Sequence, residues 1–164
     1  MELKNVKGKI VMIEGKYLFG ANSDLSDVFE IRRKVFVEEE NILEKYEFDD
    51  FDNYCVHGMI SVKGKKLGTG RILYDGDEYR IGHIAILKEE RGKKYGDFLV
   101  RMLIDKAFLN GAQEVVVGAK ISVIPFYEKI GFKQYGTIYL DTAGIERMDM
   151  KVTKVTLCKE CKKM

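Results

Sequence analysis

Three stretches in the middle of the chain are rich in apolar and β-branched residues and are separated by short glycine-containing sequences. These stretches cover residues 55–62, 66–74 and 78–87, with Gly64-Lys65 and Asp75-Gly76-Asp77 between them. Glycine and aspartate favour tight turns because they adopt backbone angles that most other residues avoid. The pattern therefore predicts an antiparallel meander of three strands.

The next segment has the 3.6-residue repeat of an amphipathic helix. The apolar positions of this face are Tyr95, Phe98, Leu99, Met102, Leu103 and Ala107. Charged residues occupy the opposite face, and Asn110-Gly111 is a typical helix end. An earlier segment, capped by Ser23 or Asp24 and continuing to about Val35, has the same repeat and predicts a first helix.

The start of the chain and the segment after the first helix are less regular. Residues 9–19 predict two short strands on either side of Glu14-Gly15. Residues 44–54 are acidic and aromatic and have neither the helical nor the strand period, which indicates a loop or an irregular turn.

The second half of the chain continues with short elements. Residues 114–119 predict a β-branched strand, and a short helix is expected between Pro125 and Gly131. Two further strands are expected at about 133–140 and 146–157. The order mixes hairpins with helical crossovers, so the predicted fold class is α/β, with a mixed sheet covered by helices on its faces.

Length and composition fit one soluble domain. The chain of 164 residues is expected to fold as a single unit, 1–164, with a lysine-rich tail from about residue 156. A net charge of +2 does not favour a nucleic-acid partner, and the absence of a leader or a membrane-spanning run favours the cytoplasm. Cys55, Cys158 and Cys161 are expected to be reduced thiols, and no metal site is predicted, because a single Cys-x-x-Cys supplies only half of a tetrahedral site.

One junction suggests a binding site. The strand-like segment "HIAIL" leads through Arg91-Gly92-Lys93-Lys94-Tyr95-Gly96 into the long amphipathic helix. Free backbone N–H groups and the positive end of the helix dipole meet at such a point and attract anions, phosphate above all. On this pattern alone the lysines could equally belong to a solvated loop.

These residues resemble the acetyl-CoA loop, Gln/Arg-x-x-Gly-x-Gly/Ala, of the GCN5-related N-acetyltransferases (GNAT family). The segments "EVVVGA" and "PFYEKIGF" are similar to two further hallmarks of the family and follow at the expected distances. Upstream, "IRRKVFVEEE", "EFDDFD" and "GTGRIL" resemble a bacterial subgroup whose substrates are mostly unassigned. The resemblance extends from the first helix to Met150, and it implies a GNAT-like acyl-CoA N-acyltransferase fold.

The chain departs from this pattern at four positions. Lys94 replaces the first glycine of the loop, so either the backbone there suffers strain or the ammonium group contacts a phosphate. Gly118, Lys120 and Arg147 stand where the subgroup has Asn, Gln and His. The contribution of these three positions to cofactor or substrate binding is therefore open.

The resemblance implies acetyl-CoA as the acyl donor and assigns residues to it. The pyrophosphate would bind the loop and helix start, the pantetheine arm would pair with the strand before the loop, and the backbone N–H of Ile84 would polarise the thioester carbonyl. The implied cofactor residues are Ile84, Ala85, Ile86, Arg91, Gly92, Lys93, Lys94, Tyr95, Gly96, Asp97 and Phe126.

Two residues are candidates for catalysis. Tyr127 matches the family tyrosine that protonates the departing thiolate, although it could merely pack beside the cofactor with Phe126. His83 is the candidate base, because strand alternation places it on one face with Ile81 and Ala85 and its ordinary pKa lies near neutrality. A structural histidine is the alternative.

Three residues are candidates for contact with the acceptor: Arg32, His57 and Arg71. Arginines on a solvated face and a structural His57 are the plainer alternatives, and the acidic residues 47–52 could recognise a cationic amine or simply be exposed.

The resulting expectation is an enzyme that transfers an acetyl group from acetyl-CoA to a primary amine of a small molecule, by direct attack with Tyr127 as general acid. A non-catalytic acyl-CoA-binding or regulatory domain is the main alternative, and a nucleic-acid-binding module is a weaker one. A homodimer through the terminal strands is possible.

Overall fold

The computed structural model describes residues 2–4 and 10–157, and its main element is an eight-stranded mixed sheet in the order β3-β4-β5-β6-β7-β10-β8, with β9 also paired to β10. The strands are β3 (Glu14–Phe19), β4 (Val56–Val62), β5 (Lys65–Tyr74), β6 (Tyr79–Ile86), β7 (Glu114–Lys120), β8 (Lys133–Gln134), β9 (Tyr139–Leu140) and β10 (Glu146–Thr153). A separate pair, β1 (Glu2–Lys4) and β2 (Ile10–Met12), lies outside this sheet. The predicted α/β class and the central meander β4-β5-β6 are confirmed.

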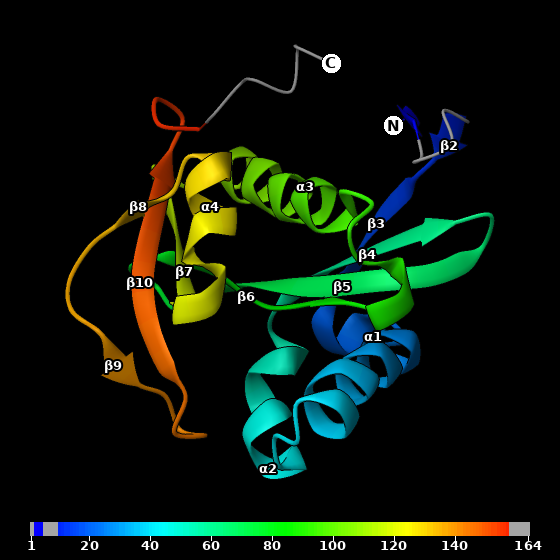
Figure 1. Ribbon diagram of the computed structural model, residues 1–164, viewed down its shortest axis with the longest axis horizontal. Helices are drawn as coiled ribbons and strands as arrows, with labels where there is room; N and C mark the ends of the chain where they lie inside the picture. Colours follow the sequence, from blue (N-terminus) through cyan, green and yellow to red (C-terminus); the bar gives the residue numbers. More distant parts are fainter. Residues whose placement is uncertain (1, 5–9, 158–164) are drawn as a thin grey trace.

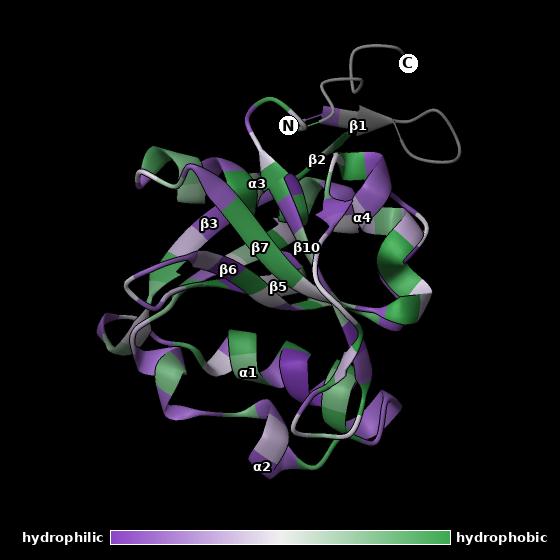
Figure 2. Cartoon of the chain, turned by 90° about the vertical axis from the view of Figure 1, so that its left-hand side faces the viewer, coloured by the Kyte–Doolittle hydropathy of each residue, from purple (hydrophilic) through white to green (hydrophobic). Residues whose placement is uncertain are grey.

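Helices cover both faces of the sheet (Figures 1 and 2). One face carries α3 (Tyr95–Leu109) and α4 (Ile124–Ile130), and the other carries α1 (Ser26–Arg32), the π-helix η2 (Arg33–Glu39) and α2 (Glu44–Glu47). Each side buries its own apolar cluster, with Leu99 and Leu103 at the centre of the first and Val28 and Met59 in the second. No helix among the described residues is long and apolar enough to cross a membrane.

Strands β6 and β7 run parallel, whereas the other neighbouring strands of the described sheet are antiparallel. The crossover between them is the helix α3, as parallel neighbours require a long connection. The two strands pair only at Tyr79–Ile81 and Val115–Val117, and the pairing ends there. The second half of β6 therefore separates from β7 and leaves room between them.

A β-bulge lies where β6 leaves β7. Thr69 of β5 pairs with Ala85 and Arg71 pairs with Gly82, so that Gly70 alone stands opposite His83 and Ile84. His83 has a positive φ of 49°, a conformation that is uncommon for residues other than glycine. Bulges bend a strand and redirect side chains, and this one accounts for the separation of β6 from β7.

Several predicted boundaries were wrong. The first helix does not end near Val35, because η2 continues it to Glu39. Residues 44–54 are not an irregular loop, since they contain α2 and the 3-10 helix η3 (Asp50–Asn53). The expected break at Glu14-Gly15 falls at Ile13, and the two short strands there pair with different partners.

The C-terminal strands are also shorter than predicted. The expected strand 133–140 is divided into β8 and β9, with Gly136 between them at a positive φ of 79°. The last strand ends at Thr153, where a turn is closed by Thr156, whose N–H donates to Thr153 Oγ1 at 3.1 Å. Cys158, Cys161 and most of the predicted lysine-rich tail lie outside the described residues.

Candidate active site

A cleft of about 1210 Å³ opens where β6 and β7 separate. Its walls come from β6, β7, the loop before α3, the start of α4, the segment between β9 and β10, and the η2–α2 region on the opposite face of the sheet. It extends from the loop before α3 to Tyr46, Glu47 and Asp49, so it can hold an extended molecule with two chemically different ends.

The loop before α3 lines one end of the cleft. Gly92 and Lys94 both have positive φ, 76° and 65°, and Lys94 is the N-cap of the helix. Tyr95, Gly96 and Asp97 follow in the first turn, whose N–H groups have no intrahelical acceptors in an α-helix. This geometry presents backbone donors and the positive end of the helix dipole to the cleft, as an anion such as pyrophosphate requires.

The positive φ of Lys94 gives a testable effect on stability. A non-glycine residue in this region costs about 1–2 kcal/mol, part of which glycine recovers, so Lys94→Gly is expected to stabilise the protein by about 1 kcal/mol. At this size the melting temperature should rise by about 2–4 °C. Lys94→Ala is the matched control, because it removes the same side chain and retains the strain. If the melting temperature of the glycine variant exceeds neither that of the alanine variant nor that of the wild type, the backbone at Lys94 is not strained.

The basic side chains of the loop are engaged within the protein. Arg91 donates to both carboxylate oxygens of Glu39 at 2.6 and 2.8 Å, and its Nε donates to the carbonyl of Ile86 at 3.0 Å. Lys93 donates to Glu90 at 2.8 Å and does not line the cleft, whereas Lys94 does. The groups of the loop that face the cleft are thus the backbone at the helix start and the side chains of Arg91 and Lys94.

The free portion of β6 forms the middle of the cleft. Ile84 and Ile86 line it and pack against the α3 side of the sheet. Ala85 is 1% exposed and belongs to the apolar cluster on the α1 side, so its side chain does not line the cleft. Only its backbone is available for strand-like pairing with a pantetheine arm.

Tyr127 lines the cleft from α4. Its ring is 6% exposed and packs edge-to-face against Phe126 and Phe132, with centroids 5.0 and 5.3 Å away. Burial raises the pKa of Tyr127 well above its usual value, and the positive charge of Arg147 opposes this shift. The hydroxyl is therefore protonated near neutral pH and can act as a proton donor.

His83 lines the same cleft from the bulge of β6. Its Nδ1 lies 2.8 Å from Oε1 of Glu47, and its ring packs edge-to-face against Phe36 at 6.2 Å. Burial lowers the pKa of His83 from 6.5, the charges of Arg32 and Arg71 lower it further, and the hydrogen bond to Glu47 opposes them. The ring is thus neutral at pH 7, as a base must be.

The predicted strand face of His83 was wrong in part. Ile81 packs into the α3-side cluster and Ala85 into the α1-side cluster, so they lie on opposite faces of the sheet. The bulge interrupts the two-residue alternation between them. His83 contacts Phe36 and Glu47 on the α1 side of the sheet. Of the two residues predicted to share its face, Ala85 does so and Ile81 does not.

Arg32 and His57 are buried below the cleft and do not line it. Arg32 is 1% exposed and His57 is fully buried, with its Nε2 located 2.8 Å from the carbonyl of Asp52. Direct contact with an acceptor, predicted for both, is therefore wrong. Burial lowers the pKa of His57, so this residue is neutral and structural.

Arg71 does reach the cleft, but it is not the solvated arginine that its sequence context suggested. It is 7% exposed, and it binds Asp52 at 2.7 Å and both oxygens of Asp49 at 2.8 and 2.9 Å. Arg32, Glu47 and Asp52 continue this network. The acidic segment therefore neutralises buried arginines instead of being freely exposed.

Sequence reasoning missed a polar cluster that joins β6, β9 and β10. Tyr139 donates to Asp149 at 2.9 Å, and Arg80 binds the same carboxylate at 2.8 and 3.1 Å. A β-carbon at Gly118 would lie 2.5 Å from the Tyr139 hydroxyl, so a larger residue there would displace the end of the Tyr139 side chain. The position of a single glycine in a β-branched strand was the one available signal.

The other two departures also have structural partners. Arg147 donates to the carbonyl of Gly118 at 2.9 Å and to Asp141 at 2.5 Å. Lys120 forms an ion pair with Glu40 across the cleft. Both line the cleft, so they help to shape it.

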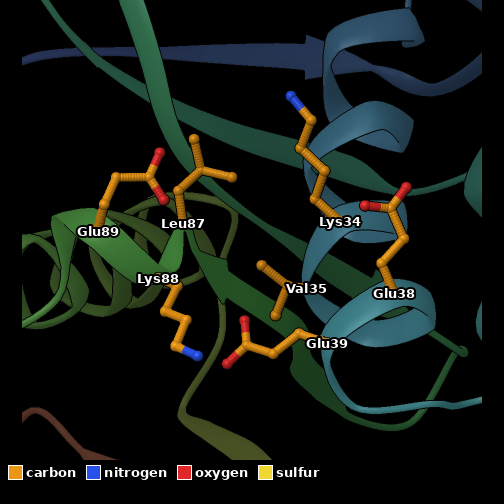
Figure 3. Close-up of a pocket in the computed structure, with 7 residues that line it drawn as sticks. All are labelled: Lys34, Val35, Glu38, Glu39, Leu87, Lys88 and Glu89. Atoms are coloured by element: carbon orange, nitrogen blue, oxygen red, sulfur yellow. The ribbon is translucent and has the colours of Figure 1, made fainter.

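A second, smaller hollow lies between η2 and the turn after β6. Figure 3 shows Lys34, Val35, Glu38 and Glu39 facing Leu87, Lys88 and Glu89. Its charged side chains are of both signs, and its lining residues include no aromatic residue, histidine or cysteine. We assign it no chemical role.

Comparison with known proteins agrees with this geometry. Residues 25–132 match the model of the Acetyltransferase (GNAT) family. The Bacillus subtilis (strain 168) protein named Uncharacterized N-acetyltransferase YjcF is 29% identical over 126 residues, which cover 77% of this chain and 90% of YjcF. The protein YyaT of the same organism is 31% identical over 114 residues, or 68% of this chain and 77% of YyaT.

Solved structures show the same fold. An acyl-CoA N-acyltransferase from Pseudomonas aeruginosa has a TM-score of 0.74 and 21% identity, covering 85% of this chain and 99% of that one. The PaiA N-acetyltransferase from Thermoplasma acidophilum, solved in complex with coenzyme A, has a TM-score of 0.64 and 17% identity, covering 87% and 99%.

The family match covers more than half of the chain, so this protein belongs to the GNAT family of acetyltransferases. Members of the family are acyltransferases that use acyl-CoA donors. The predicted family, fold class and transferase activity are confirmed at this level.

Proposed function

We propose that this protein transfers an acetyl group from acetyl-CoA to a primary amine of a small molecule by direct attack. The observation that carries the proposal is the convergence on one cleft of an anion-binding helix start, the separated edge of β6, the protonated hydroxyl of Tyr127 and the neutral ring of His83. Each group matches one requirement of amine acetylation.

The donor fits the residues present. The N–H groups at the start of α3 would bind the pyrophosphate, the free edge of β6 would pair with the pantetheine arm, and the N–H of Ile84 would polarise the carbonyl. When bound, acetyl-CoA supplies a reactive thioester.

His83 and Tyr127 would move the protons. His83 Nε2 accepts a proton from the amine, whose lone pair forms the new C–N bond while the C–S bond breaks. Tyr127 gives its hydroxyl proton to the departing thiolate. His83 then releases its extra proton to solvent and the tyrosine regains one from solvent, and the products are an amide and coenzyme A.

The acceptor is tested by a panel assay. Purified protein is incubated with acetyl-CoA and amines, aminoglycosides, amino acids or peptide N-termini, and both thiol release and the mass of the product are followed. We expect thiol release that depends on one acceptor class and a product heavier by one acetyl group. Tight binding of acetyl-CoA without acetylation of any amine would instead favour the non-catalytic acyl-CoA-binding domain, the second candidate that Gly118 and Arg147 suggest.

A further inference from the structure

The backbone at His83 is held in an unusual conformation. Its φ of 49° lies in the left-handed region, in the middle of a strand, and His83 and Ile84 together form the bulge opposite Gly70. Such strain persists only where the surroundings enforce it, and it is frequent at functional sites. Here it places the ring in the cleft wall, beneath the η2–α2 region.

Glu47 enforces the orientation of the ring. One of its carboxylate oxygens, Oε1, lies 2.8 Å from Nδ1 of His83 and 2.7 Å from Nε of Arg32. A carboxylate accepts hydrogen bonds, so the ring hydrogen in this contact is on Nδ1. A neutral imidazole then has its lone pair on Nε2, the nitrogen that remains for proton transfer.

Glu47 is itself held in place by Arg32. It is 4% exposed, and Nη2 of Arg32 donates to its backbone carbonyl at 2.5 Å. Nη1 of Arg32 binds Asp52 at 2.6 Å, which in turn binds Arg71. Arg32 therefore holds Glu47 through both its side chain and its backbone carbonyl, so the position of the carboxylate is fixed relative to the His83 ring.

The charges around the ring come from four elements. Glu47 on α2, Arg32 on α1, Arg71 on β5, and Asp49 after α2 all act on it, while Phe36 of η2 packs against its edge. With Asp52 included, three carboxylates face two guanidinium groups in this network. Removing the charge of Glu47 leaves two carboxylates and two guanidinium groups, but a leucine also leaves the buried Nε of Arg32 without this acceptor. Glu47→Gln keeps an acceptor oxygen there and is the milder variant.

We propose that Glu47 is a positioning residue, which holds His83 in the tautomer with hydrogen on Nδ1 and leaves Nε2 to accept the proton of the attacking amine. This inference rests on the proposed function for its catalytic meaning. The assignment of the tautomer does not depend on the proposed function, because it follows from the Glu47–His83 contact.

The test is nitrogen NMR of the imidazole rings combined with transfer rates. The chain has two histidines, and a His83→Asn sample assigns their signals. In the wild type we expect His83 to carry its hydrogen on Nδ1 at neutral pH. In Glu47→Leu this tautomer should lose its dominance and transfer should fall by about 10–100-fold. Glu47→Gln, which keeps one acceptor oxygen, should show a smaller loss.

The pH dependence of the transfer rate distinguishes a positioning role of Glu47 from a general loss of structure in its variants. Because the hydrogen bond that His83 donates to Glu47 raises the pKa of His83, its loss should move the acidic limb of the rate profile to lower pH while the plateau falls. Glu44→Gln is the matched control: it lies on the same helix, its side chain is 57% exposed, and it pairs with Arg33. This variant should leave the tautomer, the plateau and the limb unchanged.

Two results would overturn the inference. One is a wild-type ring with its hydrogen on Nε2, and the other is a folded Glu47→Leu variant with unchanged tautomer and unchanged transfer. If the wild type acetylates no amine, the proposed function fails, and the NMR result, which needs neither acetyl-CoA nor an amine, still decides whether Glu47 orients His83.

Discussion

Replacing Tyr127 by Phe is expected to lower the rate of acetyl transfer by about 10²- to 10⁴-fold, the usual contribution of a general acid. The substitution keeps the aromatic ring, its contacts with Phe126 and Phe132, and its burial. Only the hydroxyl is removed, and with it the proton for the departing thiolate. Affinity for acetyl-CoA and the melting temperature should change little.

Transfer rates and acetyl-CoA titrations of the wild type and the variant check this result. Tyr17→Phe is the matched control, because it also removes one phenolic hydroxyl, here donating to the carbonyl of Met102 at 2.8 Å, and it does not line the cleft. A Tyr127→Phe enzyme that transfers at the wild-type rate would remove Tyr127 from the mechanism and leave it as a packing residue.

Replacing Arg32 by Leu is expected to destabilise the protein by about 3–5 kcal/mol, the cost of breaking a buried ion pair from one side. The guanidinium group is 1% exposed and donates to Glu47, to Asp52 and to a backbone carbonyl. It also stacks near the rings of Phe29 and Phe48, at 5.7 and 5.1 Å. Without it, two buried carboxylates lose their main partner.

Urea unfolding of the two proteins measures this loss. Arg33→Leu is the matched control, since the next residue makes an exposed ion pair with Glu44 and should contribute less than about 1 kcal/mol. Equal unfolding free energies for the Arg32 and Arg33 variants would mean that the buried network does not stabilise the fold.

The same network gives a pH dependence of stability. Burial raises the pKa of Asp52, but the hydrogen bonds and charges of Arg32 and Arg71 outweigh it and hold this pKa below its usual value. The resulting stability is present above the unfolded pKa of about 3.9 and is lost as the pH falls through the lower folded value. The Arg32→Leu variant should therefore lose less stability on acidification than the wild type.

The regular part of the fold was predictable because its signals are local. Alternation and turn residues located β4, β5 and β6, and the helical repeat located α3 to within a residue. The loop before α3 was predictable for the same reason, since its glycines and the helix start are adjacent in the sequence, whereas its binding of an anion stays a prediction.

The surroundings of His83 and Gly118 were not predictable, because the groups there meet only in three dimensions. Arg32 looks like a solvated helical arginine until α2 brings Glu47 to it, fifteen residues later. His83 changes face because of a bulge, and no residue type in the strand marks that bulge. The hydroxyl of Tyr139 occupies the space beside Gly118 because it donates to Asp149, and the sequence does not bring these three residues together.

The most direct test of the account is the melting temperature of the purified protein with increasing acetyl-CoA. At a ligand concentration one hundred times the dissociation constant the native state gains about 2.7 kcal/mol, which at this size raises the melting temperature by about 5–11 °C. The account predicts such a rise, with free coenzyme A also effective because the loop binds its pyrophosphate. A folded protein whose melting temperature is unchanged by millimolar acetyl-CoA would contradict the assignment of the cleft.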